Sequence, residues 1–333
     1  MDTLLEAIDV CDVDGFCYGN YTDEEAGTGC TVIVAPEGAT GGADVRGGAP
    51  ASRETDLLRP ENTVDKVHAV CLSGGSAFGL EAASGVAREL ESRGIGLPVG
   101  PTQVPIVCSS CIFDLAYGDP TVRPDIEAGI AAVREALDNT PTTLEQGNVG
   151  AGTGATVGKL MGPATCMKAG LGAAALALGP IKVGAVVSVN ACGNVVDPFT
   201  GEWVAGMRAA ADSDQIVDME LAAFAAAGSM QMPLDRTNTT ISCIVTNVEL
   251  TKAQATKVSQ MAADAYAHAI RPTHTTNDGD TIYTLASGKL GAQASAAIPL
   301  DLLGMLAVRA LETAIVNGAK TAKTSHGIPG AAK

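Results

Sequence analysis

The chain has 333 residues, a formal net charge of −16 at pH 7, 46% hydrophobic residues and only 3% aromatic residues. No basic patch is present to neutralise phosphates, which argues against nucleic acid as a partner. The acidic balance also disfavours binding to anionic membranes. The hydrophobic fraction is large enough for a sizeable core, and length alone does not decide between one domain and two.

Cysteine usage indicates the compartment. The nine cysteines are scattered and odd in number, and the acidic N-terminus lacks the layout of a secretory signal, so we expect reduced thiols in a cytoplasmic protein. Cys108 and Cys111 have the spacing of a metal or redox pair, but no second pair or His partner follows, and no metal is expected. The longest apolar stretch, 169–192, is interrupted by Pro180 and Lys182, which favours a turn into a buried strand over a membrane span.

Strand-like and helix-like patches alternate in the first part of the chain. Strands are predicted over residues 30–35 and 67–72, an extended segment over 104–113 and a β-rich stretch over 183–196. A helix follows the second strand, because four apolar residues recur on one face: Ala83, Val86, Ala87 and Leu90. A further helix over 125–137 begins at its own acidic cap.

The pattern continues in the last third. A short helix is predicted over 218–227 and strands over 239–248 and 280–286, with a helix between the strands that is capped by Thr251 and stopped by Pro272. The apolar face of a last helix comprises Leu303, Leu306, Ala307, Ala310 and Ala314. Residues 54–65 and 138–147 are predicted exposed loops. Such alternation indicates layered α/β packing, without choosing between a doubly wound sheet and a sandwich.

A polar pair, Asn238 and Thr239, stands at the start of a β-branched strand, after the loop 232–236. A backbone cut between the two residues would give Thr239 a free α-amine beside its own hydroxyl. Threonine with an N-terminal amine is an arrangement used for covalent acyl transfer. The alternative is that Asn238 closes a turn and Thr239 simply begins a strand.

The glycine-rich segment 150–159 invites comparison with nucleotide-binding loops. Counting from Gly154 leaves three residues before Gly158-Lys159 where a P-loop needs four, and a leucine follows the lysine. The dinucleotide fingerprint lacks its preceding strand and its later acid. The glycines, including Gly150 and Gly152, are instead candidates for substrate binding that bring the backbone close to the reacting centre and place Lys159 beside it. A solvated surface lysine is the alternative.

Several of these segments together resemble one family. Asn238-Thr239 and the segments 68–80, 148–159, 183–190 and 274–281 resemble, in order and spacing, the L-aminopeptidase/D-Ala-esterase/amidase family. That family includes nylon-oligomer (6-aminohexanoate-oligomer) endohydrolases and is similar in fold to ornithine acetyltransferases. The resemblance implies a four-layer α/β/β/α sandwich, two stacked sheets flanked by helices. It further implies one catalytic domain, 1–333, divided by self-cleavage into 1–238 and 239–333.

The resemblance also implies site residues. Lys159 matches an active-site lysine of the relatives, and Asn190 matches a catalytic asparagine whose NH₂ would donate to an oxyanion. Asp278 and Asp280 align with paired acids of the nylon-oligomer hydrolases and would orient the amine or hydroxyl of Thr239. Asn190 also suits a turn ahead of Gly193, and Asp-Gly-Asp is an ordinary turn sequence.

Phe113 and His274 are two further residues of the expected site region. Some relatives carry a tyrosine in the segment matching 110–114, where Phe113 stands in this chain. Phenylalanine shapes a pocket but donates no hydrogen bond, so the difference bears on substrate preference. His274 is needed by no step of the expected chemistry and is interpreted as structural.

The expected function is a self-cleaving amidohydrolase. Its substrates would be small amides, short peptides or nylon-type oligoamides, hydrolysed through an acyl ester on Thr239 without a metal or organic cofactor. A homo-oligomer, a tetramer of processed pairs, follows from the resemblance only. The alternatives are acetyl transfer of the ornithine acetyltransferase type, against which Asn238 at the cleavage site weighs, and a binding or assembly protein of the same fold that never cuts itself.

Overall fold

The computed structural model of the protein describes residues 4–139, 141–228 and 238–332. The loop 232–236, which precedes the Asn238-Thr239 pair, lies outside the described residues. Two β-sheets share one long strand, β3 (Thr28–Val45), whose first part pairs with β2 (Cys17–Asp23) and β5 (Val67–Ser73). The last residues of β3 pair instead with β17 (Thr281–Ala286). A register shift between Val34 and Ala39 marks the change of sheet.

The first sheet has the order β1 (Glu6–Ile8), β11 (Leu171–Leu178), β12 (Ile181–Asn190), β15 (Thr239–Thr246), β17 and β3. The second sheet consists of β2, β3, β5, β8 (Val107–Cys111) and β4 (Ser52–Arg53). Within these sheets β15 pairs with β17, and β5 with β8, in parallel, and the other pairs are antiparallel. The described residues also form short strands: β6 (Leu97–Val99), β7 (Thr102–Val104), β9 (Thr156–Val157), β10 (Met167–Lys168), β13 (Asn194–Val196), β14 (Trp203–Ala205) and β16 (Ile270–Arg271).

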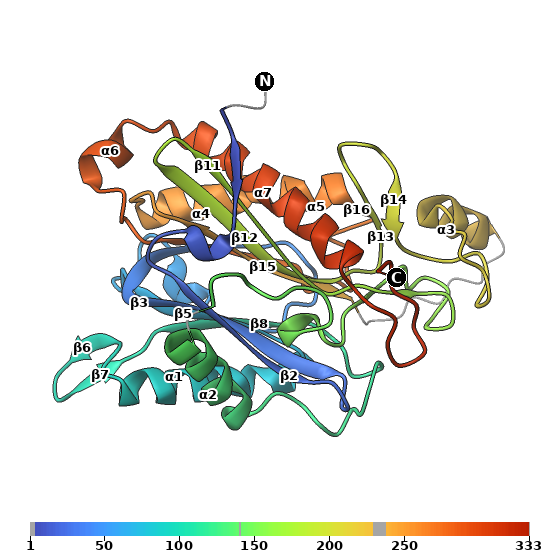
Figure 1. Ribbon diagram of the computed structural model, residues 1–333, viewed down its shortest axis with the longest axis horizontal. Helices are drawn as coiled ribbons and strands as arrows, with labels where there is room; N and C mark the ends of the chain where they lie inside the picture. Colours follow the sequence, from blue (N-terminus) through green and yellow to red (C-terminus); the bar gives the residue numbers. More distant parts are fainter. Residues whose placement is uncertain (1–3, 140, 229–237, 333) are drawn as a thin grey trace.

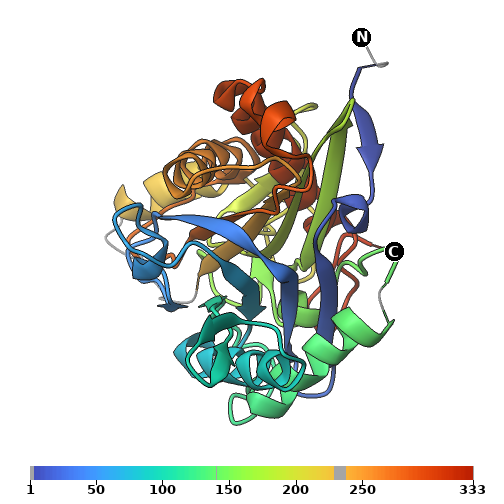
Figure 2. The same ribbon diagram turned by 90° about the vertical axis from the view of Figure 1, so that its left-hand side faces the viewer.

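Helices cover the outer face of each sheet (Figure 1; Figure 2). The first sheet carries α4 (Lys252–Ala262), α5 (Asp264–Ala269) and α7 (Leu300–Lys320), and the second carries α1 (Ala82–Ser92) and α2 (Ile126–Arg134). The helices α3 (Met219–Gly228) and α6 (Ala292–Ala296) lie outside these two groups.

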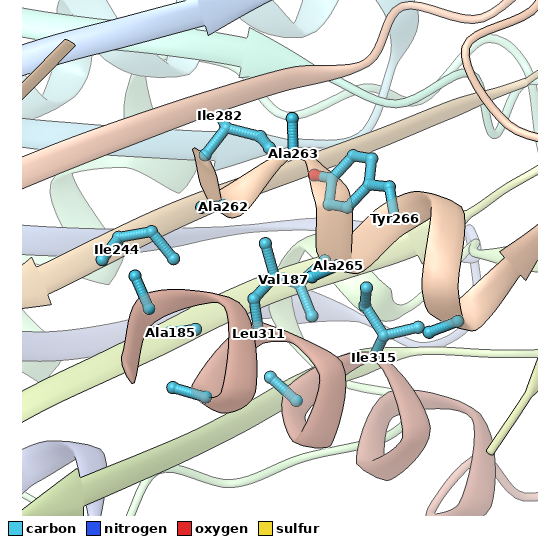
Figure 3. Close-up of a cluster of buried hydrophobic side chains, with 14 of the residues drawn as sticks. Ala185, Val187, Ile244, Ala262, Ala263, Ala265, Tyr266, Ile282, Leu311 and Ile315 are labelled. Carbon is cyan, nitrogen blue, oxygen red and sulfur yellow. The ribbon is translucent and has the colours of Figure 1, made fainter. Parts of the chain in front are cut away.

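Three apolar layers account for this stacking. One layer lies between the sheets and includes Ile33 of β3 and Ile241 of β15. A second layer packs β12 and β15 against the first group of helices, as Figure 3 shows for Val187, Ile244 and Leu311. A third layer packs β3 and β5 against α1 and α2. The four-layer α/β/β/α arrangement expected from the resemblance is therefore confirmed.

Most predicted elements are present, and their caps are the expected ones. Asp125 Oδ1 accepts a hydrogen bond from Ala128 N at 3.0 Å, and Thr251 forms a capping box with Gln254. The single helix predicted from Thr251 to Pro272 is instead divided into two consecutive helices, α4 and α5. The chain breaks at Ala263, and α5 ends before Pro272 because Ile270 leaves the helix to pair with Val195 of β13.

The apolar segments belong to the core. The stretch 169–192 forms the β11–β12 hairpin, which confirms the interpretation as a buried strand. Helix α7 is long and apolar enough to cross a membrane by length and composition alone, but 67% of that stretch is buried inside the protein. It is explained as a core helix that covers β11 and β12.

Candidate active site

Thr239 is the first residue of β15, and its side chain faces the space between the two sheets. Side chains alternate along a strand, and Ile241 and Cys243 of the same strand lie in the layer between the sheets. Thr239 is only 5% exposed. Its hydroxyl donates to the carbonyl oxygen of the preceding residue, Asn238.

Asn190 lies directly opposite Thr239 on the neighbouring strand β12, so the two side chains share one face of the sheet. The Asn190 side chain is fully buried. Its Oδ1 accepts from Lys159 Nζ at 2.6 Å and from Thr156 N at 3.1 Å, and its Nδ2 donates to the carbonyl oxygen of Phe113 at 3.0 Å. Asn190 therefore joins the start of β15 to two separate segments of the chain, 150–159 and the residues around Phe113.

Lys159 is inside the site rather than on the solvated surface. Its Nζ donates to the backbone oxygen of Asn190 at 3.1 Å as well as to the side chain. Burial lowers the pKa of Lys159 to about 8, while the charges of Asp278 and Asp114, among others, act in the opposite direction. A fraction of the lysine is therefore uncharged near pH 8.

The other side of Thr239 is bounded by the turn Asp278-Gly279-Asp280, which leads into β17. Asn238 forms a bridge with Asp278, and Gly279 N donates to the carbonyl oxygen of Asn238 at 3.2 Å. A Cβ atom on Gly279 would lie 2.8 Å from Thr239 Oγ1, so a side chain does not fit there. The glycine thus allows the turn to approach both the hydroxyl and the peptide bond ahead of it.

The two carboxylates of this turn have different surroundings. Asp280 Oδ1 accepts from Thr240 N at 2.8 Å, and its Oδ2 contacts His274 Nδ1 at 2.8 Å and accepts from His274 N at 3.1 Å. Asp278 Oδ2 accepts from Thr275 N at 2.6 Å, but its buried Oδ1 has no hydrogen-bond partner within the described parts of the chain. Burial, and then the charge of Asp280, raise the pKa of Asp278. Asp278 is therefore the carboxylate with an oxygen available to a ligand.

A pocket lies beside Lys159. Its lining residues are Phe113, Asp114, Ala116, Tyr117, Gly154, Thr156, Lys159, Gly162, Pro163, Cys166 and Ile328. Three of them, Phe113, Thr156 and Lys159, are the hydrogen-bond partners of the Asn190 side chain. The pocket wall therefore contains the hydrogen-bond partners of the residue that stands opposite Thr239.

Phe113 lines the pocket, as its predicted role requires, whereas Gly150 and Gly152 do not. A Cβ on Gly150 would lie 2.2 Å from Thr31 Oγ1, and one on Gly152 would lie 1.9 Å from Leu171 N. These glycines are needed where the segment packs against β3 and β11. Their role in substrate binding stays a prediction, and Gly154 is the glycine of this segment that borders the pocket.

Two buried charged residues were missed in the sequence. Lys168 is fully buried and donates to the carbonyl oxygens of Gly152 and Ala155 at 2.9 Å each, and burial lowers the pKa of Lys168 to about 7. Asp114, in the pocket wall, accepts from Thr28 Oγ1 at 2.7 Å, and burial raises the pKa of Asp114. An isolated lysine within an apolar run and an acid directly after a predicted strand were the available signals.

The Cys108–Cys111 pair behaves as ordinary core residues. All nine cysteines are free thiols, and these two are buried in β8. Burial raises the pKa of Cys108 to about 12. Within residues 4–139, 141–228 and 238–332, no cluster of three or more His, Cys, Asp or Glu has an arrangement that could hold a metal ion.

Comparison with known proteins places the chain in a family. The model of peptidase family S58 matches residues 9–332. An uncharacterized aminopeptidase of Mycobacterium leprae is 38% identical, over 96% of this chain and 92% of that protein. A 6-aminohexanoate-oligomer endohydrolase of Kocuria sp. is 31% identical, over 93% of this chain and 85% of that protein.

Solved structures show the same fold. The L-aminopeptidase D-Ala-esterase/amidase of Ochrobactrum anthropi, described as a variant of the Ntn hydrolase fold, matches with a TM-score of 0.66 at 17% identity, over 95% of this chain and 86% of that chain. The β-aminopeptidase of Burkholderia sp. matches with a TM-score of 0.65 at 19% identity, over 97% and 90%. The chain therefore belongs to peptidase family S58 and is an amidohydrolase with the N-terminal-nucleophile hydrolase fold.

Proposed function

We propose that the chain cleaves its own Asn238–Thr239 peptide bond and then uses Thr239 as the nucleophile of amide hydrolysis. The contact between the Thr239 hydroxyl and the Asn238 carbonyl group carries this proposal. The same carbonyl oxygen accepts a hydrogen bond from Gly279 N at 3.2 Å. That donor is placed to stabilise the negative charge that develops on the oxygen during attack.

Self-cleavage proceeds in two steps, formation of an ester and its hydrolysis. The Thr239 oxygen attacks the Asn238 carbonyl carbon, the C–N bond breaks, and the hydroxyl proton passes to the departing nitrogen. Water then hydrolyses the resulting ester, which leaves a carboxylate on Asn238 and both a hydroxyl and a free α-amine on Thr239. Chain 1–238 and chain 239–333 remain associated through the pairing of β12 with β15.

The free amine supplies the base for turnover. An α-amine has an unperturbed pKa of roughly 7.7–8.0, so it accepts the hydroxyl proton near neutral pH. Thr239 attacks the substrate carbonyl, the amine product leaves, and water releases the acyl group. The Lys159 ammonium stabilises the negative charge of the tetrahedral intermediate. Asn190 orients Lys159, because its Oδ1 accepts from Nζ and its Nδ2 donates to Phe113.

Small amides, short peptides or linear oligoamides are the substrate class that this site supports. The pocket combines apolar walls from Phe113 and Pro163 with the charged groups of Lys159 and Asp114. Such walls suit a side chain or a row of methylene groups next to the scissile bond. The names of the relatives, aminopeptidase and 6-aminohexanoate-oligomer endohydrolase, point to the same class of bond.

Replacement of the nucleophile tests the proposal. We expect the wild type to give fragments 1–238 and 239–333 on denaturing electrophoresis, and Thr239→Ala to give one full-length band without amidase activity. Thr239→Ser should retain both activities, because it keeps the hydroxyl. Thr240→Ala is the matched control, since the buried Thr240 Oγ1 has no hydrogen-bond partner in the described structure. Cleavage at this bond in Thr239→Ala would refute the proposal.

A further inference from the structure

The segment after α7 folds back over the protein as a tight hairpin. Ser325 and Ile328 pair through two backbone hydrogen bonds, Ser325 N to Ile328 O at 3.1 Å and Ile328 N to Ser325 O at 2.9 Å. The two residues between them, His326 and Gly327, have φ values of 50° and 75°. Positive φ at both central positions is the geometry of a two-residue hairpin turn, and it fixes the direction of Ile328.

Contacts from both sides hold this hairpin in place. Lys168 N donates to Pro329 O at 2.8 Å, immediately after Ile328. Lys323, just before the turn, exchanges two hydrogen bonds with the side chain of Asn148, at 2.9 and 3.0 Å. Ala332 N donates to Ala322 O at 3.0 Å and closes the base of the segment. The hairpin is therefore a fixed part of the fold near the pocket.

The hairpin contributes to the pocket wall. Ile328 is among the lining residues, together with Tyr117 and Pro163. The His326 ring lies 4.8 Å from the Tyr117 ring, and His326 Nε2 contacts Glu24 O at 2.9 Å, so the turn rests on another wall of the same pocket. An aliphatic side chain fixed in this position occupies volume that a substrate group would otherwise fill.

We propose that Ile328 is a specificity-determining residue that limits the bulk of the substrate group held beside the scissile amide. The inference rests on the proposed function for the identity of the nucleophile, whereas the pocket and the hairpin are independent of it. A difference of a single methylene in an apolar pocket changes discrimination by roughly 10–200-fold. Removal of most of the isoleucine side chain therefore has a measurable effect on substrate preference.

The test uses the whole protein after self-cleavage, with both fragments present, and three substrates: the 4-nitroanilides of glycine, leucine and phenylalanine. We expect Ile328→Ala to raise the ratio of kcat/KM for the phenylalanine substrate over the glycine substrate by about tenfold. Ile328→Val, one methyl group smaller than the wild type, should move the ratio in the same direction by less. Lys323→Ala is the matched control on the same segment, because its side chain is exposed and its backbone bonds to Asn148 are kept.

Two outcomes would overturn the inference: an unchanged ratio in both Ile328 variants, or an equal loss of activity on all three substrates. Self-cleavage is scored separately on denaturing gels and should match the wild type in every variant. If Thr239→Ala still hydrolyses the anilides, the proposed nucleophile is wrong, and the ratio in Ile328→Ala still tests the pocket wall. The two failures are thus distinguishable.

Discussion

The two strands that flank Thr239 differ in what they bring to it. The antiparallel neighbour β12 brings Asn190, whose side-chain partners Phe113, Thr156 and Lys159 all line the pocket. The parallel neighbour β17 is preceded by the turn that ends at Asp280, and the bonds of this turn go to the chain itself, to Asn238 O and Thr240 N. One flank borders the pocket, and the other holds the peptide bond ahead of Thr239.

Under the proposed function, this division lets the Thr239 hydroxyl take part in two reactions. Self-cleavage needs the Asn238 carbonyl to be held and polarised, which is the geometry of the β17 flank. Hydrolysis of a separate substrate needs a pocket and a cation beside it, which is the geometry of the β12 flank. Substitutions on the two flanks should therefore separate the two reactions.

The largest effect is expected on the β17 flank. A Cβ atom in Gly279→Ala would lie 2.8 Å from Thr239 Oγ1, so the hydroxyl or the turn must move. Misplacement by about 1 Å can lower a rate by on the order of 10²-fold, and we expect self-cleavage to slow at least that much. A time course on denaturing gels measures it, with Thr276→Ala, at an exposed position of the same loop, as the control. Cleavage at the wild-type rate in Gly279→Ala would contradict the account.

On the β12 flank, Lys159→Met should spare self-cleavage and reduce amide hydrolysis. Loss of one stabilising charge or donor at an oxyanion typically costs about 10²–10³ in kcat. Lys182→Met is the control. Lys182 lies on β12 at the end far from Asn190, in a surface ion pair with Asp14. If cleavage and hydrolysis fell together in Lys159→Met, the flanks would not have separate roles.

The pH dependence of hydrolysis tests the separate roles of the Thr239 amine and Lys159. The Thr239 amine must lose its proton to act as a base, whereas Lys159, with a pKa lowered to about 8 by burial, must keep its proton. We expect kcat/KM to pass through a maximum near pH 8 and then to fall by about tenfold per pH unit. The alkaline limb should be absent from the residual activity of Lys159→Met, and its persistence there would assign the limb to another group.

The titration of Lys159 does not itself destabilise the fold as the pH rises. Because the folded pKa of Lys159 lies below its ordinary value of 10.5, the unfolded chain binds more protons between about pH 8 and pH 10.5. The contribution of this lysine to the free energy of unfolding therefore rises with pH across that window. Denaturant titrations at both ends of the window check the sign.

The smallest effect is expected at His274, which holds Asp280 and stacks on Tyr266 with a ring separation of 5.5 Å. His274 has a backbone φ of 56°, a conformation that asparagine also tolerates. His274→Ala should lower kcat by roughly tenfold, within the range of a weakened hydrogen-bonded support, and leave KM unchanged. His274→Asn should restore most of kcat, because its NH₂ can donate to Asp280. Equal losses in both variants would argue against a positioning role.

The elements that hold the site could be predicted because their signals are local. The caps at Asp125 and Thr251 and the β-branched run after Thr239 lie within a few residues of what they determine. The alternation of strands and helices indicated layered α/β packing, whereas the choice of a sandwich over a doubly wound sheet came from the family resemblance. The helix after Thr251 was predicted too long because pairing of Ile270 with Val195 is a contact between distant segments.

Within the site, the sequence predicted a set of residues but not the different contacts that each of them makes. A shift of one residue in the β12–β15 register would turn Asn190 away from Thr239, and no local pattern specifies that register. The sequence pattern does not predict different roles for Asp278 and Asp280, which are distinguished by their hydrogen bonds in the structure. Glycine spacing likewise does not reveal that Gly150 is required by packing against Thr31.

In the proposed function, scission of the Asn238–Thr239 peptide bond creates the catalytic base. Intact mass measurement and N-terminal sequencing of the purified, fully active wild type test it most directly. The account predicts two polypeptides with the masses of residues 1–238 and 239–333, the smaller one beginning at Thr239. Full activity in a sample that contains only the uncut chain, or a new N-terminus at any other residue, would contradict it.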